Sequence, residues 1–281
     1  MLGCGRQRIS CGRDRRRTVI ELAGGELLME RKGSVQWILF NRVEARNALT
    51  WAMYEALVAQ CEAVNEDRSI RALVLAGNGG TFAAGTDITQ FREFRTLRDA
   101  TDYEARVDHV AETVESVRVP VIAAIAGACT GGGATIATCC DIRIASPSAR
   151  FGVPIARTLG NCLSHQNYAR LFTTLGLART KELLMTGRLM KADEMLASGY
   201  VAEVVAGEED LFPRAQSLAE TISANAPLTL EVSKRALRRV RDRLFPIEED
   251  TDIIEACYLS EDFHEGVEAF LAKRKPSWKG R

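Results

Sequence analysis

The chain has 281 residues, 46% of them apolar, and its 37 Lys and Arg residues balance 37 Asp and Glu residues. A chain of this length and apolar content can bury a sizeable core, so bulk disorder is excluded. The zero net charge gives no general affinity for nucleic acid, and we expect no nucleic-acid partner.

Residues 1–18 differ from the rest because arginine dominates them. They predict either a basic arm or a disordered basic leader with no role in the fold, and we favour the leader. The segment lacks the apolar stretch of a secretory signal, and it shows little of the amphipathic pattern of a transit peptide.

From residue 19 to residue 145, short apolar runs alternate with helical patterns. The runs predict strands at residues 19–30, 35–40, 71–76, 121–125 and 141–145, and the patterns between them predict helices at residues 51–65, 99–118 and 134–140. Strands that alternate with helices are typical of an α/β sheet covered on both faces, and near-continuous apolar strands fit that burial.

Residues 119–140 carry no charge and contain three consecutive glycines. Their length would allow a transmembrane helix, but Pro120 and the glycines break a single apolar helix. We expect instead a buried strand, a glycine turn over residues 127–133 and a buried helix, with no membrane partner. Such a turn presents backbone N–H groups at a helix N-terminus, where the helix dipole favours negative charge. The turn is therefore a candidate site for a developing anion.

After residue 145, helical patterns dominate. They cover residues 163–175, 180–185, 191–198, 211–224, 228–243, 247–259 and 262–273, and one strand is expected at residues 200–205. The chain is thus predicted to comprise a leader at 1–18, an α/β core at 19–226 and a C-terminal helical region at 227–281.

The eight cysteines are scattered along the chain. The chain contains neither a Cys-x-x-Cys pair nor a cluster of Cys and His, so a zinc site is not expected. Most of the cysteines lie in apolar runs, as small core residues do in a reducing compartment. We expect a cytoplasmic protein with no metal site.

Several short motifs follow one another along the chain. They are NRVEARNAL at 41–49, FAAGTDI at 82–88, PVIAAIAG at 120–127, GGG at 131–133, DIRIA at 141–145, FGVP at 151–154, EDFHEGVEAF at 261–270 and KR at 273–274. In this order the set resembles the crotonase (enoyl-CoA hydratase/isomerase) superfamily over about residues 20–278. The resemblance implies a crotonase/ClpP-like spiral of ββα units, with C-terminal helices that assemble the chain into a homotrimer or hexamer.

The shared chemistry of this superfamily is stabilisation of a thioester enolate. Two backbone N–H groups bind the carbonyl oxygen of an acyl-CoA, and by match they belong to Thr86 and Gly132. Glycine lets a backbone approach a ligand closely, and donors aimed at an oxygen that gains charge contribute roughly 3–4 kcal/mol each. The competing interpretation is that the glycines only allow tight packing of a helix on a strand. The implied substrate is a coenzyme A thioester, with no permanently bound cofactor.

The resemblance also implies segments that flank pantetheine and the adenine ring. The residues implied are Arg42, Glu44, Ala45, Arg46, Ala48, Ala84, Gly85, Asp87, Ile88 and Lys273. Arg42, Arg46 and Lys273 are candidates for charge-assisted bonds to phosphates, or else for an ordinary solvated surface.

Two positions depart from the family pattern. Hydratases of this family carry one glutamate two residues after the third glycine and another directly after FGxP; here these positions hold Thr135 and Ile155. Hydration of an enoyl thioester needs one group to activate water and another to move a proton to the α-carbon. Because threonine is no base near neutral pH and isoleucine has no proton to offer, we do not expect a standard hydratase mechanism.

The segment that follows Ile155 is expected to border the acyl pocket. Arg157 is a candidate for pairing with a substrate carboxylate, as in a malonyl-type acyl-CoA decarboxylase, or it pairs with protein carboxylates. His165 either titrates in catalysis or faces solvent from a helix. Asn161 either orients water or substrate or caps the helix that begins near Cys162, and we favour the cap. Cys162 either has a pKa lowered by that helix start or is a buried, inert thiol, and we favour the inert thiol.

Two hypotheses remain open. The first is an acyl-CoA enzyme that uses the two backbone N–H groups with non-standard proton transfer. The second is a non-catalytic homologue that binds CoA esters. An unrelated α/β hydrolase is disfavoured because the chain has no Gly-x-Ser-x-Gly motif.

Overall fold

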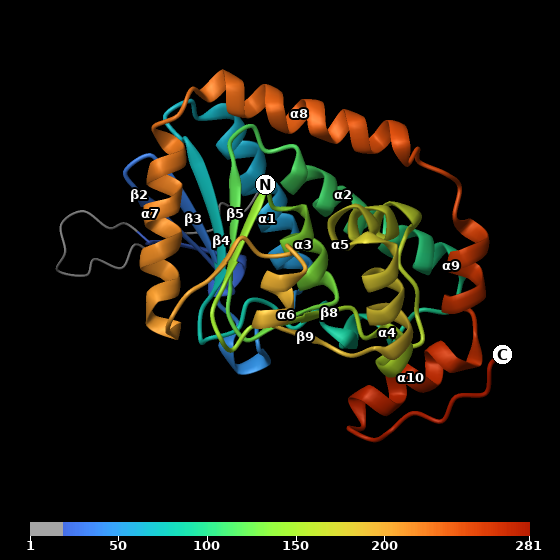
Figure 1. Cartoon of the computed structure of the whole chain (residues 1–281). Helices are drawn as coiled ribbons and strands as arrows, with labels where there is room; N and C mark the ends of the chain where they lie inside the picture. The colour runs from blue at the N-terminus through green and yellow to red at the C-terminus, as the bar shows by residue number, and fades with distance from the viewer. Residues whose placement is uncertain (1–18) are drawn as a thin grey trace, which may run out of the picture.

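A seven-stranded sheet forms the centre of the computed structural model, which describes residues 19–281 (Figure 1). The predicted leader lies outside the described residues. In spatial order the strands are β1 (Val19–Leu22), β2 (Leu27–Lys32), β3 (Val35–Phe40), β4 (Ala72–Gly77), β5 (Val121–Ile125), β7 (Ile142–Ala145) and β10 (Glu203–Val204). The pairs β1–β2 and β2–β3 are antiparallel, and every pair from β3 to β10 is parallel.

The single strand predicted at 19–30 is a hairpin of two strands. A 3-10 turn, η1 (Ala23–Gly25), separates β1 from β2. Gly24 and Gly25 have φ of 67° and 95°, in the left-handed region that glycine enters at little cost. The apolar pattern continues through this turn, so the sequence did not reveal it.

A second, smaller sheet was not predicted. It contains β6 (Ala128–Thr130), β8 (Arg150–Gly152) and β9 (Met190–Lys191). These strands have two or three residues each, too few for an alternating pattern to mark them. The sheet matters because β6 lies inside the predicted glycine turn and fixes its course.

Helices cover both faces of the large sheet, as predicted. The helices are α1 (Trp51–Glu66), α2 (Leu97–Glu115), α3 (Gly132–Cys139), α4 (Ile155–Thr158), α5 (His165–Thr186), α6 (Ala192–Ala197), α7 (Leu211–Ser223), α8 (Pro227–Leu244), α9 (Thr251–Tyr258) and α10 (Glu261–Leu271). Within β4, Leu73 and Leu75 join the core cluster shared with α1 and α3, whereas the alternating residue Val74 joins the cluster shared with α7. The strand is therefore buried on both sides, as its apolar sequence requires.

Several helix boundaries differ from the prediction by a few residues; α9, for example, begins at Thr251 rather than at residue 247. Helix α3 begins at Gly132 rather than near Ala134, since the glycine turn leads directly into the helix. The helices predicted at 163–175 and 180–185 form one run, α5, interrupted at Gly176, where φ is 73° and ψ is 161°.

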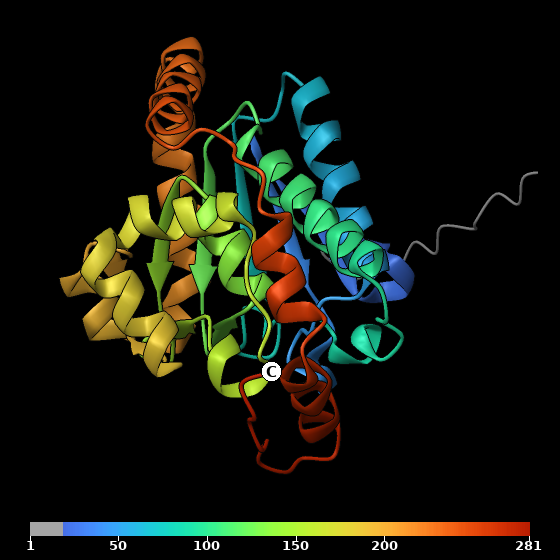
Figure 2. The same ribbon diagram turned by 90° about the vertical axis from the view of Figure 1, so that its right-hand side faces the viewer.

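The C-terminal helices behave differently from one another. Helix α8 runs across the top of Figure 1, and none of its residues is buried. Helices α9 and α10 return to the core, where Tyr258 and Phe263 pack with Phe91 and Tyr103 in one cluster. Figure 2 shows α9 beside α2. The division at residue 226 remains a prediction, but α10 lines the cavity described below through Phe270 and Leu271.

The uncharged stretch at residues 119–140 folds as strand, turn and helix, as predicted. It supplies β5, β6 and α3. Over residues 19–281, no helix combines the length and the apolar character needed to span a bilayer.

Candidate active site

A cavity of about 460 Å³ lies between α2, the start of α3, α4 and α10. It collects most of the residues that the resemblance implied, although they are spread over more than a hundred positions of the sequence. Those that line it are Arg42, Ala45, Arg46, Ala48, Ala84, Gly85, Thr86, Asp87, Ile88, Gly132, Thr135, Ile155 and Arg157. Glu44, His165 and Lys273 do not line it.

Two loops meet at one wall of this cavity through their glycines. Gly85 has φ of 109° and Gly131 has φ of 51°, so both use backbone conformations that other residues rarely adopt. A Cβ atom on Gly131 would lie 3.4 Å from the Cα of Gly85. The N–H of Thr130 donates to Ala83 O at 3.0 Å and ties the loops together. The residues after the two glycines, Thr86 and Gly132, are thereby brought to the same wall.

The N–H groups of Thr86 and Gly132 have no protein acceptor within residues 19–281. Gly132 is the first residue of α3, and the first N–H groups of a helix have no intrahelical partner. No side chain caps this end of α3. Since the helix dipole adds positive potential there, the wall suits a negatively charged oxygen.

Sterics explain why glycine occupies position 132. A Cβ atom there would lie 2.1 Å from Tyr54 Oη and 3.0 Å from Thr86 Oγ1. The hydroxyl of Tyr54 is itself fixed 2.9 Å from Thr86 Oγ1, and that of Tyr103 lies 3.1 Å from the same atom. Gly133 has a packing role, because its Cβ would lie 2.4 Å from Ala83 O. The packing interpretation therefore holds for Gly133, whereas the ligand interpretation of Gly132 remains a prediction.

Arg42 and Asp87 hold the rim of the cavity together. Arg42 pairs with Asp87 at 2.6 Å and with Glu26 at 3.2 Å. Burial raises the pKa of Asp87, but hydrogen bonds from Thr89 and Arg42 outweigh it, and the pKa is lowered. Asp87 is therefore ionised and committed to this rim, whereas Arg46 lines the cavity with an exposed side chain.

Thr135 and Ile155 line the same cavity. Thr135 is 9% exposed, and its hydroxyl bonds back to Gly131 O at 3.4 Å. Ile155 is also 9% exposed and belongs to the main core cluster. Neither side chain can take up a proton at neutral pH.

The remaining candidates have distinct surroundings. Arg157 lines the cavity with an exposed side chain, and no carboxylate of the described chain pairs with it. His165 begins α5, where its N–H donates to Asp250 at 2.7 Å. The predicted cap at Asn161 is wrong: Ser164 caps α5 through its side chain, because it stands directly before the first helical residue. A hydrogen bond with Cys257 and burial raise the pKa of Cys162, which fits an inert thiol.

Glu104 is a lining residue that the sequence reasoning missed. It is 3% exposed and lies on α2 between Tyr103 and Val107 in the buried stripe. Burial raises its pKa to about 8, although the hydroxyl of Tyr258 opposes this by donating to the carboxylate. A glutamate at a core position of an amphipathic pattern was the signal available in the sequence.

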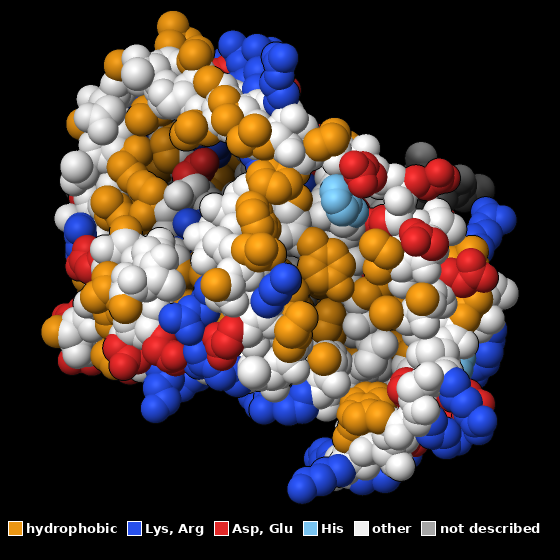
Figure 3. Space-filling model, turned by 45° about the vertical axis from the view of Figure 1, so that its right-hand side comes forward, with side chains coloured by type: hydrophobic (Ala, Val, Ile, Leu, Met, Phe, Trp, Pro, Cys, Tyr) orange, Lys and Arg blue, Asp and Glu red, His pale blue; other side chains and the backbone are white. Residues whose placement is uncertain are grey.

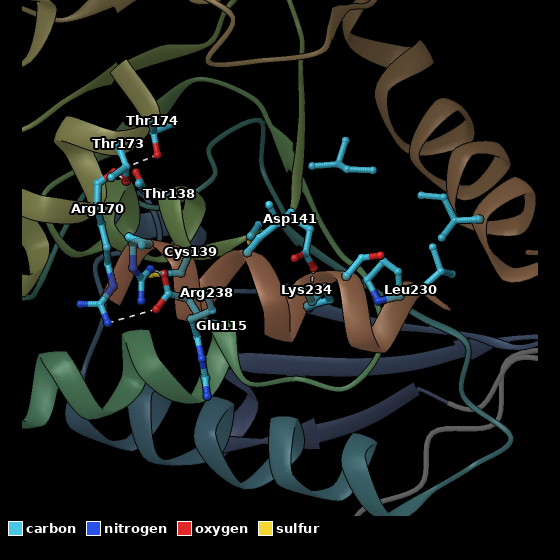
Figure 4. A pocket seen from close by; sticks show the side chains of 17 residues that line it. Glu115, Thr138, Cys139, Asp141, Arg170, Thr173, Thr174, Leu230, Lys234 and Arg238 are labelled. Carbon is cyan, nitrogen blue, oxygen red and sulfur yellow. Dashed lines mark hydrogen bonds and ion pairs between the residues drawn. The ribbon is translucent and has the colours of Figure 1, made fainter. Parts of the chain in front are cut away.

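A second cavity, of about 400 Å³, lies between α8, α3 and α5. Figure 4 shows that its charged side chains pair with each other: Arg170 reaches Glu115 at 3.1 Å, and Lys234 reaches Asp141 at 2.5 Å. The pair of Lys234 and Asp141 attaches α8 to the core, whereas the pair of Arg170 and Glu115 joins α5 to α2. In the part of the chain that the structure describes, no His, Cys, Asp and Glu side chains group closely enough to hold a metal ion.

Comparison with known proteins agrees with this geometry. The family model for enoyl-CoA hydratase/isomerase matches residues 30–281. A probable enoyl-CoA hydratase of Rhizobium meliloti is 36% identical over 257 residues, which cover 91% of this chain and 98% of the relative. The 2,3-dehydroadipyl-CoA hydratase of Escherichia coli is 31% identical over 258 residues, with 91% and 99% covered.

Solved structures give the same result. An enoyl-CoA hydratase/carnithine racemase from Magnetospirillum magneticum matches with a TM-score of 0.74 and 34% identity, covering 91% of this chain and 96% of that one. A methylmalonyl-CoA decarboxylase in complex with 2-nitronate-propionyl-CoA matches with a TM-score of 0.83 and 27% identity, covering 91% and 99%. The fold is that of the crotonase superfamily. The chain belongs to the enoyl-CoA hydratase/isomerase family and is an acyl-CoA-processing enzyme of that family.

Proposed function

We propose that the cavity binds a CoA thioester and stabilises its enolate through the N–H groups of Thr86 and Gly132. The observation that carries the proposal is the pair of N–H groups without a protein acceptor in residues 19–281, both on one cavity wall. Buried N–H groups almost always have a partner, so donors left free in a cavity are expected to serve a ligand. Each contributes roughly 3–4 kcal/mol to an oxygen that gains charge.

The rim would hold the CoA portion. Arg42 is engaged by Glu26 and Asp87, so its role is to fix the loop. Arg46, whose exposed guanidinium lines the cavity, is the candidate for a phosphate contact. Lys273 does not line the cavity. It would contact CoA only if the nucleotide end of the molecule extends beyond the cavity rim.

The reaction is not expected to be ordinary hydration, because Thr135 and Ile155 replace the two carboxylates that it requires. One observation favours a second candidate, decarboxylation of a malonyl-type acyl-CoA. Arg157 lines the cavity without an ion pair to any described carboxylate, which suits a substrate carboxylate. The likeness to a methylmalonyl-CoA decarboxylase supports this alternative.

A homotrimer or hexamer is part of the proposal. Helix α8 exposes Leu228, Val232, Leu237, Val240 and Leu244. Figure 3 shows hydrophobic side chains gathered around a hollow on the upper left of the surface. An exposed apolar face of this kind suits contact between subunits.

The test uses a panel of enoyl-, hydroxyacyl- and malonyl-type CoA thioesters, with products identified by mass. Binding without conversion across the panel would favour a non-catalytic homologue. Conversion of crotonyl-CoA at ordinary enzyme rates would contradict the argument from the missing carboxylates. Tight binding of 2-nitronate-propionyl-CoA, which mimics an enolate, is the expected result for the anion-binding wall.

To remove the N–H of Gly132 without a steric clash, the substitution is made in a Tyr54→Phe variant. Gly132→Pro alone would place a carbon 2.1 Å from Tyr54 Oη. Tyr54→Phe removes that oxygen and serves as the matched control. We expect Tyr54→Phe/Gly132→Pro to turn over about 100- to 1000-fold more slowly than Tyr54→Phe. Equal rates in two folded variants would exclude the assignment.

A further inference from the structure

Glu104 occupies a buried position where an ionised carboxyl group is energetically unfavourable. Residues Ala100, Tyr103, Val107 and Val110 form the buried stripe of α2, and Glu104 interrupts it at a helix position that faces the same way. Its side chain lines the cavity with the proposed anion-binding wall. Glutamate is almost never fully buried without a partner of opposite charge, so its presence here calls for a role.

The partners of Glu104 are hydrogen-bond donors without charge. The hydroxyl of Tyr258 donates to Oε1, and the N–H of Ser164 donates to Oε2 at 3.2 Å. Asn161 Nδ2 in turn donates to Tyr258 Oη at 3.2 Å. These contacts come from α9 and from the segment before α5, and they fix the carboxyl group in one orientation without neutralising it.

The titratable groups around Glu104 do not compensate its charge. Asp108 on the same helix and Asp250 before α9 are acidic, and both raise the pKa of Glu104, as burial does to a larger extent. The nearby guanidinium of Arg170 is directed to Asp108 at 3.4 Å and Glu115 at 3.1 Å. The other groups that interact with Glu104 are the thiol of Cys162 and four phenols, all with raised pKa values; the phenols are those of Tyr54, Tyr103, Tyr168 and Tyr258. Glu104 is thus a carboxyl that changes protonation near pH 8.

Glu104 also lies close to the proposed wall. The preceding residue, Tyr103, places its hydroxyl 3.1 Å from Thr86 Oγ1, so this turn of α2 packs on the loop that carries the Thr86 N–H. Asp87 is the other carboxylate among the described lining residues, and Arg42 holds it in its ion pair. Glu104 is therefore the lining carboxyl that remains available for proton transfer.

We propose that Glu104 is the acid–base residue of this cavity and takes the place of the two absent glutamates. The inference rests on the proposed function, since it requires a bound thioester. The carboxylate takes a proton from the carbon next to the thioester carbonyl. The C–H electron pair forms the enolate double bond, and the carbonyl π electrons move to the oxygen held by the two N–H groups. Return of a proton from Glu104 to the carbon chain restores the carboxylate and completes the step.

The test is exchange of the α-hydrogens of hexanoyl-CoA and 3-hexenoyl-CoA in D₂O, followed by mass. The wild-type protein should incorporate deuterium, and Glu104→Gln should slow this at least 100-fold. Calorimetry should show that Glu104→Gln binds hexanoyl-CoA within about threefold of wild type. Glu112→Gln, an exposed glutamate of the same helix, is the matched control and should exchange at the wild-type rate.

A pH series separates proton transfer from a structural role. The logarithm of the wild-type exchange rate should rise with pH with unit slope and level off above about 8. If Glu104→Gln misfolds, Glu104→Asp should retain this profile at a reduced rate. Two results would overturn this inference but not the proposed function: wild-type protein that binds hexanoyl-CoA without exchange, or Glu104→Gln that exchanges at the wild-type rate. Wild-type protein that binds no CoA thioester would overturn the proposed function and the inference with it.

Discussion

The stability of Glu104→Gln relative to wild type should increase with pH. The pKa of Glu104 rises from 4.5 to about 8 on folding, chiefly through burial. Between these values the folded protein holds a proton that the unfolded chain has released. Stability conferred by that proton is fully present below about pH 4.5, falls as pH rises, and is lost above about pH 8. Glutamine does not titrate and removes this dependence.

The magnitude follows from the width of that interval. From 4.5 to about 8 is about 3.5 pH units, and about 1.4 kcal/mol per unit gives a difference of about 5 kcal/mol above pH 8. At pH 7 the difference is about 3 kcal/mol. Glutamine also loses an acceptor for Tyr258 or Ser164, a cost of about 1–3 kcal/mol that does not vary with pH. The slope against pH is therefore the quantity to measure.

Urea denaturation of both proteins at pH 5, 7 and 9 measures this slope. The difference in unfolding free energy between Glu104→Gln and wild type should grow by several kcal/mol across the series. Glu112→Gln, whose side chain is exposed, should give a flat line. A difference that stays constant with pH for Glu104→Gln would refute the claim that this carboxyl is buried and uncompensated. Confirmation would show that the cavity lowers stability in order to keep a titratable group.

Three further outcomes are expected. Ile155→Glu combined with Thr135→Glu should create hydration of crotonyl-CoA that wild type lacks; a folded double variant without it would show that these positions are mapped wrongly. Arg46→Ala should weaken binding of a CoA thioester about fivefold in calorimetry and leave binding of the matching pantetheine thioester unchanged. Equal losses for the two ligands would contradict a phosphate contact of Arg46. Gly133→Ala places a Cβ 2.4 Å from Ala83 O and should cost about 1–3 kcal/mol in urea denaturation; unchanged stability would contradict the close packing there.

The sequence by itself predicted the strands and helices of the core, because long apolar runs and amphipathic helices carry their own periodicity. The buried strand at Val121–Ile125 and the amphipathic helix α2 are examples. It also indicated the family, because the ordered set of motifs resembles the crotonase superfamily. It did not predict β6, β8 and β9, whose two or three residues each pair with strands distant in the chain.

Only the tertiary structure decided which groups face the cavity. His165 stands near Ile155 in sequence but lies off the cavity wall, whereas Glu104 comes from a distant helix and lies on it. A helical pattern fixes which side of α2 is buried. Whether a buried position meets a core or a cavity depends on the helices that pack against it, here α9 and α10. The state of the Glu104 carboxyl likewise follows from its neighbours Tyr258, Asp108 and Asp250, which long-range packing brings together.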